Sequence, residues 1–271
     1  MKWLILRRSS QLMVLGFFLL GPLAGIWLIS GTLSASLTLD FLPLTDPLVF
    51  LQTLFSGHKP AAPALIGVLV ILIFYGLVGG RVFCSWVCPI NIIADSTAWL
   101  RDKIGIRGVL FFSNSSRYWL LAMVCGLALV FQSALWEMIN PVTIFPRAII
   151  FGLSSAIVVA AALFFFDLLL GKRGWCQICP TGAFYSLLGY LSPLKVIAGN
   201  RERCDQCQAC YQVCPEPQVL HEPLRVEGSS PVIRSGQCTN CGRCIDVCPQ
   251  SVFKFGNRFS SENKGKAIKC A

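Results

Sequence analysis

The chain has 271 residues, of which 55% are hydrophobic and 13% are charged. Soluble globular domains contain roughly 45–50% apolar and about 25% charged residues, so this chain lacks the polar surface of a soluble protein of its size. The composition excludes an ordinary soluble enzyme and indicates a membrane protein. Its two histidines are too few for a diheme site with paired imidazole ligands or for a histidine-rich zinc enzyme.

Four apolar stretches are predicted to cross the membrane as helices, which takes about 20 residues each. In chain order they are Leu12–Leu33, Ala64–Gly80, Tyr118–Trp136 and Ala148–Leu170. A further apolar run, Leu39–Phe55, is interrupted by aspartates and prolines, so we expect an interfacial or re-entrant segment there and not a fifth span. A cleavable signal peptide is the alternative for residues 1–36. Its apolar core of 22 residues exceeds the roughly 7–15 typical of such peptides, which favours an uncleaved helix.

The basic residues predict the orientation of these helices. Of the 23 Lys and Arg residues, 21 fall in the N-terminal segment, in the loop between the second and third stretches, and in the tail from Lys172 onward. Only Lys59 and Arg147 lie in the two other connections. Because basic residues accumulate on the cytoplasmic side, both termini and the middle loop are predicted to be cytoplasmic.

A weak internal repeat places a cysteine-proline turn after the second and after the fourth stretch. The residues concerned are Cys84, Cys88 and Pro89 in the first turn and Cys176, Cys179 and Pro180 in the second. Cys84 and Cys176 are 92 positions apart, and the dipeptides Asp46-Pro47 and Asn140-Pro141 of the outer loops are 94 apart. Because both halves run in the same direction, we expect a pseudo-twofold axis along the membrane normal that brings the two turns together.

The four turn cysteines are candidates for a quinol or redox site, together with Asp167. The thiols could form a reversible disulfide, hold a metal or cluster, or line a quinone head-group pocket; the alternative is that they are buried and inert. Arg81 and Arg173 lie close to them and would lower the pKa of the thiols. Asp167 is the only carboxylate in the predicted spans and a candidate proton acceptor, although it could equally be solvated or paired with Lys172 or Arg173.

Two cysteine runs in the tail carry the strongest motif in the chain. Each reads C-x2-C-x2-C-x3-C-P, the pattern of bacterial ferredoxins with two [4Fe–4S] clusters, in which the fourth cysteine of each run binds the other cluster. The predicted ligands are Cys204, Cys207, Cys210 and Cys248 for cluster 1, and Cys238, Cys241, Cys244 and Cys214 for cluster 2. Zinc is the alternative for such C-x2-C pairs, but the duplicated ferredoxin spacing argues against it. Disulfides are excluded by the predicted cytoplasmic side.

The sequence therefore predicts an α-helical polytopic membrane protein with a ferredoxin-like module. Residues 1–198 would form four transmembrane helices as two parallel repeats, and residues 199–271 a cytoplasmic α+β domain with two clusters. The 23 residues between Cys214 and Cys238 are rich in proline and glycine, so we expect a loop there that could dock a partner. The basic excess follows the membrane orientation, and no motif indicates nucleic-acid binding. Cys125 and Cys270 are read as incidental.

The chain resembles, over nearly its whole length, the NapH family of ferredoxin-type quinol dehydrogenase membrane components of periplasmic nitrate reductase systems. The segments that carry this resemblance are Gly80–Pro89, Arg173–Cys176, Gly182–Tyr185 and Val213–Leu220. The wider group includes the methylamine-utilisation membrane ferredoxins and the membrane parts of nitrous oxide reduction regulators. In this family both turns read C-x3-C-P, whereas the second turn here is one residue shorter, which questions a role that needs four equivalent thiols.

The resemblance implies a function in the cytoplasmic (inner) membrane of a bacterium. The protein would oxidise quinol and pass electrons to a NapG-type periplasmic iron–sulfur protein, then towards a c-type cytochrome and nitrate reductase. Because the clusters are predicted on the cytoplasmic side, either quinol is oxidised near the outer face or the turns hold another redox centre. Two alternatives are a cytoplasmic donor that reduces the clusters for cofactor maturation or metal reduction, and a non-enzymatic anchor whose clusters only stabilise a docking domain.

Overall fold

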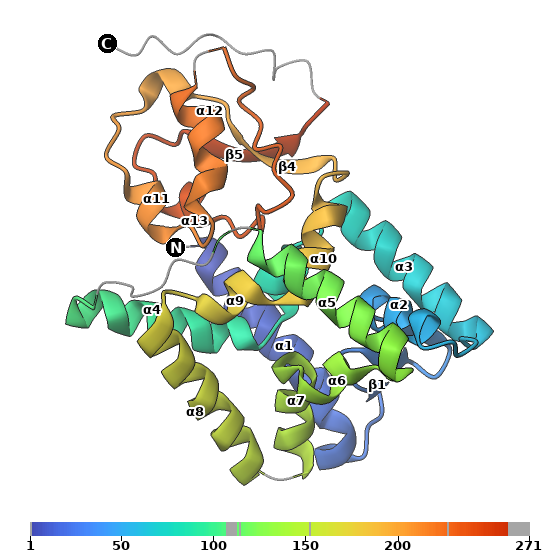
Figure 1. Cartoon of the computed structure of the whole chain (residues 1–271). Coiled ribbons are helices and arrows are strands. Elements are labelled where there is room, and N and C mark those ends of the chain that lie inside the picture. Colours follow the sequence, from blue (N-terminus) through green and yellow to red (C-terminus); the bar gives the residue numbers. More distant parts are fainter. Residues whose placement is uncertain (1, 107–112, 114, 152, 227, 260–271) are drawn as a thin grey trace. The chain divides into compact units, whose positions relative to one another are not determined.

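The computed structural model describes residues 2–106, 113, 115–151, 153–226 and 228–259, and the chain divides into two compact units (Figure 1). The cluster unit comprises Met1–Ser10, Phe74–Trp86 and Tyr185–Ala271, and the helical unit comprises Gln11–Ile73 and Val87–Phe184. The cluster unit thus contains the region predicted as the ferredoxin-like domain and also segments from the predicted membrane domain. The domain boundary at residues 198/199 stays a prediction. Cys270 lies outside the described residues.

The first helix begins and ends earlier than predicted. Helix α1 spans Lys2–Ala24, and Gly25 follows it with a φ of 70°, donating its N–H to the carbonyl of Gly21. A glycine in the left-handed conformation is a common helix end, since it has no Cβ to strain. The prediction of one helix to Leu33 was therefore wrong beyond this glycine. The chain instead forms the antiparallel sheet β1-β2-β3, whose strands are β1 (Ile29–Gly31), β2 (Ala35–Thr38) and β3 (Leu42–Thr45).

The remaining predicted spans fall on helices that follow in chain order. The helices after the sheet are α2 (Pro47–Phe55), α3 (Ala62–Val78), α4 (Ile90–Ile104), α5 (Ser116–Phe131), α6 (Leu135–Ile139), α7 (Pro141–Phe151), α8 (Leu153–Leu170), α9 (Gly174–Ile178) and α10 (Pro180–Gly189). The second predicted span falls on α3, the third on α5 and α6, and the fourth on α7 and α8. In the part of the chain that the structure describes, one helix, Lys2–Pro22, has the length and apolar character to cross a membrane. The apolar helices Ala62–Val78, Ser116–Phe131 and Ser154–Leu170 are shorter. The third predicted span ends early, because Gln132 takes a left-handed conformation after α5.

The two outer-loop dipeptides of the repeat perform the same local role. Asp46 precedes Pro47, the first residue of α2, and its Oδ1 accepts the N–H of Leu48 at 2.7 Å. Asn140 precedes Pro141, the first residue of α7, and its Oδ1 accepts the N–H of Val142 at 3.1 Å. A short polar side chain followed by proline satisfies the free N–H groups at a helix start. The weak repeat seen in the sequence thus has a structural counterpart at both helix starts.

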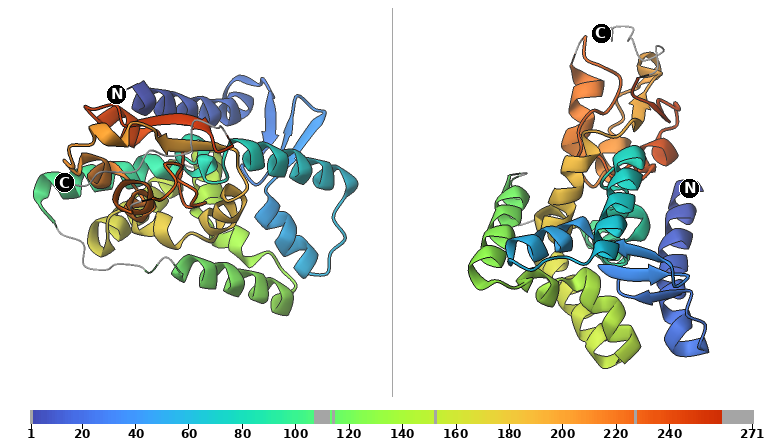
Figure 2. Two further views of the ribbon diagram at one scale, coloured as in Figure 1. Left: turned by 90° about the horizontal axis from the view of Figure 1, so that it is seen from above. Right: turned by 90° about the vertical axis from the view of Figure 1, so that its right-hand side faces the viewer.

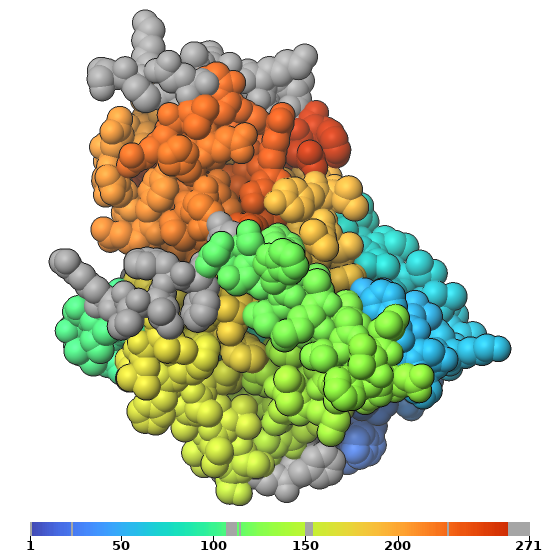
Figure 3. Space-filling model, in the orientation of Figure 1, coloured from blue at the N-terminus to red at the C-terminus, as the bar shows by residue number. Residues whose placement is uncertain are grey.

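The helical unit packs α4 and α7 against α8, and α2 against α5. Its core contains Leu48, Val124, Trp136 and Cys179. Large apolar side chains nevertheless lie on the surfaces of α5 and α8, which are green and yellow in Figure 3. Val130 on α5 is 71% exposed, and Val158 on α8 is 67% exposed. These helices present apolar surface that the described chain does not cover.

The cluster unit contains a two-stranded antiparallel sheet. Strand β4 (Leu194–Ala198) pairs with β5 (Phe253–Asn257), with Val196 opposite Phe255, and the two lie side by side in Figure 2. The short helices that follow β4 are η2 (Arg201–Arg203), α11 (Ala209–Val213), η3 (Pro217–Leu220), α12 (His221–Arg225) and α13 (Arg243–Val247). The sheet and these helices enclose the core of the unit.

The segment between the two cysteine runs is more ordered than predicted. It contains η3 and α12, and Val219, Leu220 and Ile233 are buried in the core with Val196 and Phe253. The prediction that this segment is rich in loops was wrong over Pro217–Leu220 and His221–Arg225, which are helical, whereas Ile233 lies outside any helix or strand. Apolar side chains of both parts contribute to the small core of the unit. Pro217 is the first residue of η3. Proline suits this position, because the N–H that it lacks would have no hydrogen-bond partner within the helix.

Candidate iron–sulfur centre

The two cysteine runs have the same local structure, displaced by 34 residues. Each run contains two residues with left-handed backbone, then a five-residue helix, then a cysteine in an extended conformation. The left-handed residues are Gln206 (φ 56°) and Gln208 (φ 59°) in the first run, and Asn240 (φ 46°) and Gly242 (φ 72°) in the second. Backbone that alternates between right- and left-handed conformations turns successive N–H groups to one side and forms concave sites for anions, including iron–sulfur clusters. Both runs therefore have backbone suited to an anionic cluster.

The thiols fall into two neighbouring groups that cross between the runs. Burial raises the pKa of the Cys210 thiol, and the charges of Cys204 and Cys248 raise it further. Burial also raises the pKa of Cys214, followed by the charges of Cys241 and Cys238. The fourth cysteine of each run thus lies electrostatically close to the first three of the other run.

Cys244 connects these groups. Its pKa is raised first by burial, then by Cys241, Cys238, Cys214 and Cys210. Thiols packed this closely in a buried site repel one another when deprotonated, and a bound metal centre removes that conflict by neutralising their charge. The donor set therefore fits cationic iron.

The surroundings of the two thiol groups differ. A cavity lined by all four predicted ligands of cluster 2 is closed by apolar side chains that include Val196 and Ile233. The second cavity is lined by Cys204 and Cys210, with Tyr211 and Arg225 beside them. Cys204 and Cys207 are exposed, whereas Cys241 and Cys244 are buried. One site is therefore enclosed and the other reaches the surface.

A single metal ion needs three or four ligands gathered around one point. Within the described residues, no group of three or more His, Cys, Asp or Glu side chains is arranged to hold a metal ion. A single zinc ion binds each of its thiolate sulfurs at a Zn–S distance of about 2.3 Å, so all the sulfurs surround one atom. In a [4Fe–4S] cubane, each thiolate binds a different iron. The cysteines therefore fit [4Fe–4S] clusters, both by donor type and by the crossed arrangement of the thiols.

The first cysteine turn holds the loop that contains Cys238. It is a π-helix, η1 (Phe83–Val87). Ser85 Oγ donates to the carbonyl of Thr239 at 2.8 Å, and Trp86 Nε1 donates to that of Asn240 at 3.2 Å. In return, Asn240 Nδ2 donates to the carbonyl of Val78 at 3.2 Å. The turn thus fixes both residues that follow Cys238.

Arg81 binds both segments that supply the cluster 2 thiols. Its Nη1 lies 2.6 Å from Glu216 Oε1, two residues after Cys214, and donates to the carbonyl of Gln237 at 3.0 Å, one residue before Cys238. Arg81 is 2% exposed. The sequence predicted that Arg81 acts on a neighbouring turn thiol and missed these contacts. In the sequence, the available indication of a partner for Arg81 was the acidic residue Glu216, which directly follows Cys214 and Pro215.

Backbone packs closely around the same turn because three glycines leave room. A Cβ on Gly80 would lie 1.7 Å from the carbonyl oxygen of Tyr185, and one on Gly236 would lie 2.0 Å from that of Ser186. A Cβ on Gly189 would lie 2.7 Å from the carbonyl oxygen of Gly236. Any larger residue at these positions would push apart the turn, the end of α10 and the loop before Cys238.

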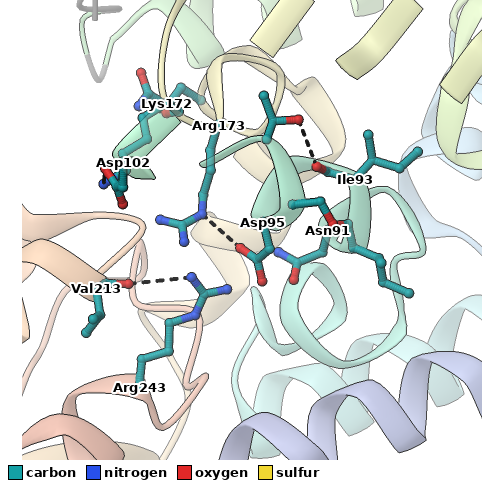
Figure 4. A network of polar contacts seen from close by, with 12 residues as sticks. Asn91, Ile93, Asp95, Asp102, Lys172, Arg173, Val213 and Arg243 are labelled. Carbon is teal, nitrogen blue, oxygen red and sulfur yellow. Dashed lines mark hydrogen bonds and ion pairs between the residues drawn. The ribbon is translucent and has the colours of Figure 1, made fainter. Parts of the chain in front are cut away.

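The second cysteine turn lies in the helical unit and is held by its own polar contacts. Arg173 Nε lies 2.9 Å from Asp95 Oδ1, as Figure 4 shows, and Lys172 Nζ lies 2.7 Å from Asp102 Oδ1. The two basic residues expected as alternative partners of Asp167 thus form ion pairs with α4. Cys179 is buried in the core of the unit.

Asp167 is buried and orders the second turn. Its Oδ1 accepts the backbone N–H of Trp175 at 2.8 Å, and Arg101 donates to the carbonyls of Asp167 and Leu168. Asp167 is 2% exposed. The carboxylate therefore has a structural role next to Cys176.

The four turn cysteines are distributed over both units. Cys84 belongs to the cluster unit, whereas Cys88, Cys176 and Cys179 belong to the helical unit. Cys88 and Cys179 are buried, and Cys84 and Cys176 are partly buried. Their assembly into one site stays a prediction.

Two family models match the chain. One, described as a 4Fe-4S binding domain, matches residues 60–107 and 151–197, which include both cysteine turns. The other, described as a 4Fe-4S dicluster domain, matches residues 196–249, which include both cysteine runs. The matches place ferredoxin-type iron–sulfur domains in the chain, at its C-terminal end in particular.

Curated relatives cover nearly the whole chain. Ferredoxin-type protein NapH of Escherichia coli (strain K12) is 44% identical over 264 residues, which are 97% of this chain and 92% of the relative. Methylamine utilization ferredoxin-type protein MauN of Methylorubrum extorquens is 46% identical over 258 residues, 95% of this chain and 90% of the relative. Regulatory protein NosR of Pseudomonas aeruginosa is 27% identical over 80% of this chain but 29% of its own length. No solved structure matches the chain.

Proposed function

From the premise that the chain belongs to the NapH and MauN family of ferredoxin-type electron-transfer proteins, we propose that it oxidises quinol and relays the electrons through two [4Fe–4S] clusters. The observation that carries this proposal is the crossed grouping of the thiols in the cluster unit. A quinol delivers two electrons and two protons, so two one-electron carriers match one turnover. The protein's part is to hold the carriers, tune them and exclude side reactions.

The proposed ligands follow the two thiol groups. Cluster 1 would be held by Cys204, Cys207, Cys210 and Cys248, and cluster 2 by Cys238, Cys241, Cys244 and Cys214. When bound, each cluster supplies one-electron transfer. The duplicated backbone displaced by 34 residues supports two equivalent sites, and the two lined cavities support their separation.

We place the protein in a bacterial cytoplasmic membrane with four transmembrane helices and both termini in the cytoplasm. The 21-residue apolar helix Lys2–Pro22 and the three shorter apolar helices support this placement. The exposed apolar side chains of α5 and α8 support it too, since large uncovered apolar surface is rare on soluble monomers. The orientation rests on the 21 of 23 basic residues that fall in three segments of the chain.

The turn cysteines and Asp167 form the proposed quinol or redox site. The residues are Cys84, Cys88, Cys176, Cys179 and Asp167. The match of a 4Fe-4S binding model to both turns supports an iron-binding role for the thiols. Asp167 would accept a proton released by quinol. Iron beyond eight atoms per chain would assign an additional centre to these cysteines.

The proposed acceptor is a NapG-type periplasmic iron–sulfur protein that passes electrons to a c-type cytochrome. The chain is about equally similar to a NapH relative, at 44% identity, and to a MauN relative, at 46% identity. A cytoplasmic donor is the second candidate direction of electron flow. It is favoured by the exposure of Cys204 and Cys207, which would let cluster 1 exchange electrons with a soluble protein.

Anaerobic purification followed by electron paramagnetic resonance (EPR) tests the proposed direction. We expect two reduced [4Fe–4S] signals after addition of a menaquinol analogue and none after addition of the oxidised quinone. The variants Cys207→Ser and Cys241→Ser should each lose one signal. Clusters that a flavodoxin reduces and the quinol analogue does not would overturn quinol oxidation and favour the cytoplasmic donor. Unchanged nitrate respiration with both variants would favour the alternative in which the protein is a non-enzymatic anchor.

A further inference from the structure

Two buried cations lie beside the segment that supplies Cys238. Arg81 and Lys195 are each 2% exposed. Lys195, on β4, donates from Nζ to the carbonyls of Gly189 and Ser235, and Arg81 donates to that of Gln237. Ser235 and Gln237 lie three residues and one residue before Cys238, so both cations are bound to the backbone that leads into this cysteine.

The charges of both cations act on the same thiol. Burial raises the pKa of Cys238 to about 11, and Lys195 and Arg81 oppose that rise. Burial lowers the pKa of Lys195 to about 8, and the charge of Cys238 opposes that fall. The placement of both charges rests on their hydrogen bonds, since Lys195 Nζ lies 3.5 Å from the carbonyl oxygen of Ser235 and Arg81 Nη1 lies 3.0 Å from that of Gln237.

One carboxylate shares this environment. Glu216 is buried, forms the 2.6 Å ion pair with Arg81, and raises the pKa of Cys214. Among the described residues, the charged side chains beside the cluster 2 thiols thus include the cations of Arg81, Lys195 and Arg243, of which Arg243 lines the cavity, and the anion of Glu216. Arg81 and Lys195 bind backbone just before Cys238, whereas Glu216 follows Cys214 by two residues.

The surroundings of cluster 1 differ in charge and in exposure. Its cavity contains Arg225, which is exposed and lies 5.7 Å from the centre of the Tyr211 ring. Water and salt screen an exposed charge, whereas a buried charge acts through a low dielectric. The buried charges of Arg81 and Lys195 should therefore act more strongly on cluster 2 than the exposed charge of Arg225 acts on cluster 1.

We infer that Arg81 and Lys195 set the reduction potential of cluster 2, raising it above the value that its apolar enclosure alone would give. The inference rests on the proposed function, because it requires that the eight thiols hold two clusters. Reduction adds one electron and no atom to the site, and the added negative charge is stabilised by a nearby cation that stays fixed in both states.

An EPR-monitored redox titration of the full-length protein tests the inference. Dithionite and mediators supply the electrons, and Cys241→Ser and Cys207→Ser assign the two signals. Lys195→Met should lower the reduction equilibrium constant of cluster 2 about tenfold, a shift of about 59 mV to lower potential for a one-electron couple. Lys195→Arg should keep the wild-type value. Arg225→Gln, the matched control, should leave cluster 2 unchanged.

A second pair of variants gives the opposite signs. Arg81→Gln should lower the potential of cluster 2, and Glu216→Gln should raise it, with cluster 1 unchanged in both. If Arg81→Gln lost its iron, the Lys195 variants would decide. Equal shifts of both clusters, or none in Lys195→Met with eight irons per chain, would overturn the inference. Wild-type protein with fewer than eight irons per chain would overturn the proposed function instead.

Discussion

Arg81 and Arg173 occupy equivalent positions in the internal repeat, 92 residues apart, and form ion pairs that are buried and nearly buried, respectively. Arg81 pairs with Glu216 at 2.6 Å in the cluster unit, and Arg173 pairs with Asp95 at 2.9 Å in the helical unit. Each guanidinium fastens its own cysteine turn to a different segment of the chain. Both halves of the repeat therefore use an arginine at the same position to hold a cysteine turn, but the two arginines pair with different segments of the chain.

The Arg173–Asp95 pair should matter for stability. Both side chains are nearly buried, at 10% and 12% exposure, so Asp95→Asn removes the ion-pair partner of a nearly buried guanidinium and should cost about 3 kcal/mol of unfolding free energy. The control is Asp102→Asn in the Lys172 pair, whose side chains are 63% and 38% exposed. That change should cost less than about 1 kcal/mol. Denaturant titration in detergent measures both, and equal costs would contradict the assignment.

The close backbone packing at Gly80 predicts a clear difference between glycines. Gly80→Ala would place a Cβ 1.7 Å from the carbonyl oxygen of Tyr185, so we expect a loss of stability of at least about 2 kcal/mol and reduced iron content. Gly76→Ala is the matched control, because its Cβ meets nothing within 4 Å. In a helix that change should be neutral or stabilising by up to about 1 kcal/mol. Thermal unfolding with iron quantification checks both, and a tolerated Gly80→Ala would show that this packing is wrong.

Asp167 combines a structural hydrogen bond with a proposed proton-accepting role, and two variants separate them. Asp167→Asn keeps an oxygen acceptor for the N–H of Trp175 but cannot take a proton from quinol. We expect normal stability and quinol-dependent cluster reduction slowed at least about tenfold, since a positioned base contributes that much or more. Asp167→Ala should lose stability as well. Stopped-flow reduction by a menaquinol analogue measures the rate. A wild-type rate in Asp167→Asn would leave the residue a structural role alone.

Much of the fold follows from local patterns in the sequence. The ferredoxin spacing predicts two equivalent cysteine runs, and the structure gives them the same backbone 34 residues apart. The Asp46-Pro47 and Asn140-Pro141 dipeptides predict equivalent loops, and both start helices. These features depend on neighbouring residues, so the sequence contains enough information to locate them.

The failures depend on contacts between distant residues or on single glycines. Gly25 ends α1 within an apolar run that contains no charged residue, so composition alone extends the helix too far. Val219 and Leu220 enter the core through pairing of segments that the sequence does not relate. Arg81 was expected to act on the thiols of its own turn, but its partner Glu216 is 135 residues away. Long-range pairing of this kind is not visible in local spacing.

Loss of single cysteines tests the crossed ligand sets most directly. Iron content and EPR spectra of Cys248→Ala and Cys214→Ala would be compared with those of Cys204→Ala and Cys241→Ala, in the full-length protein purified without oxygen. We predict that Cys248→Ala perturbs the same signal as Cys204→Ala, and that Cys214→Ala perturbs the same signal as Cys241→Ala. If Cys214→Ala instead perturbed the signal lost in Cys204→Ala, each run would hold its own cluster, and the crossed pair on which the proposed electron relay depends would be wrong.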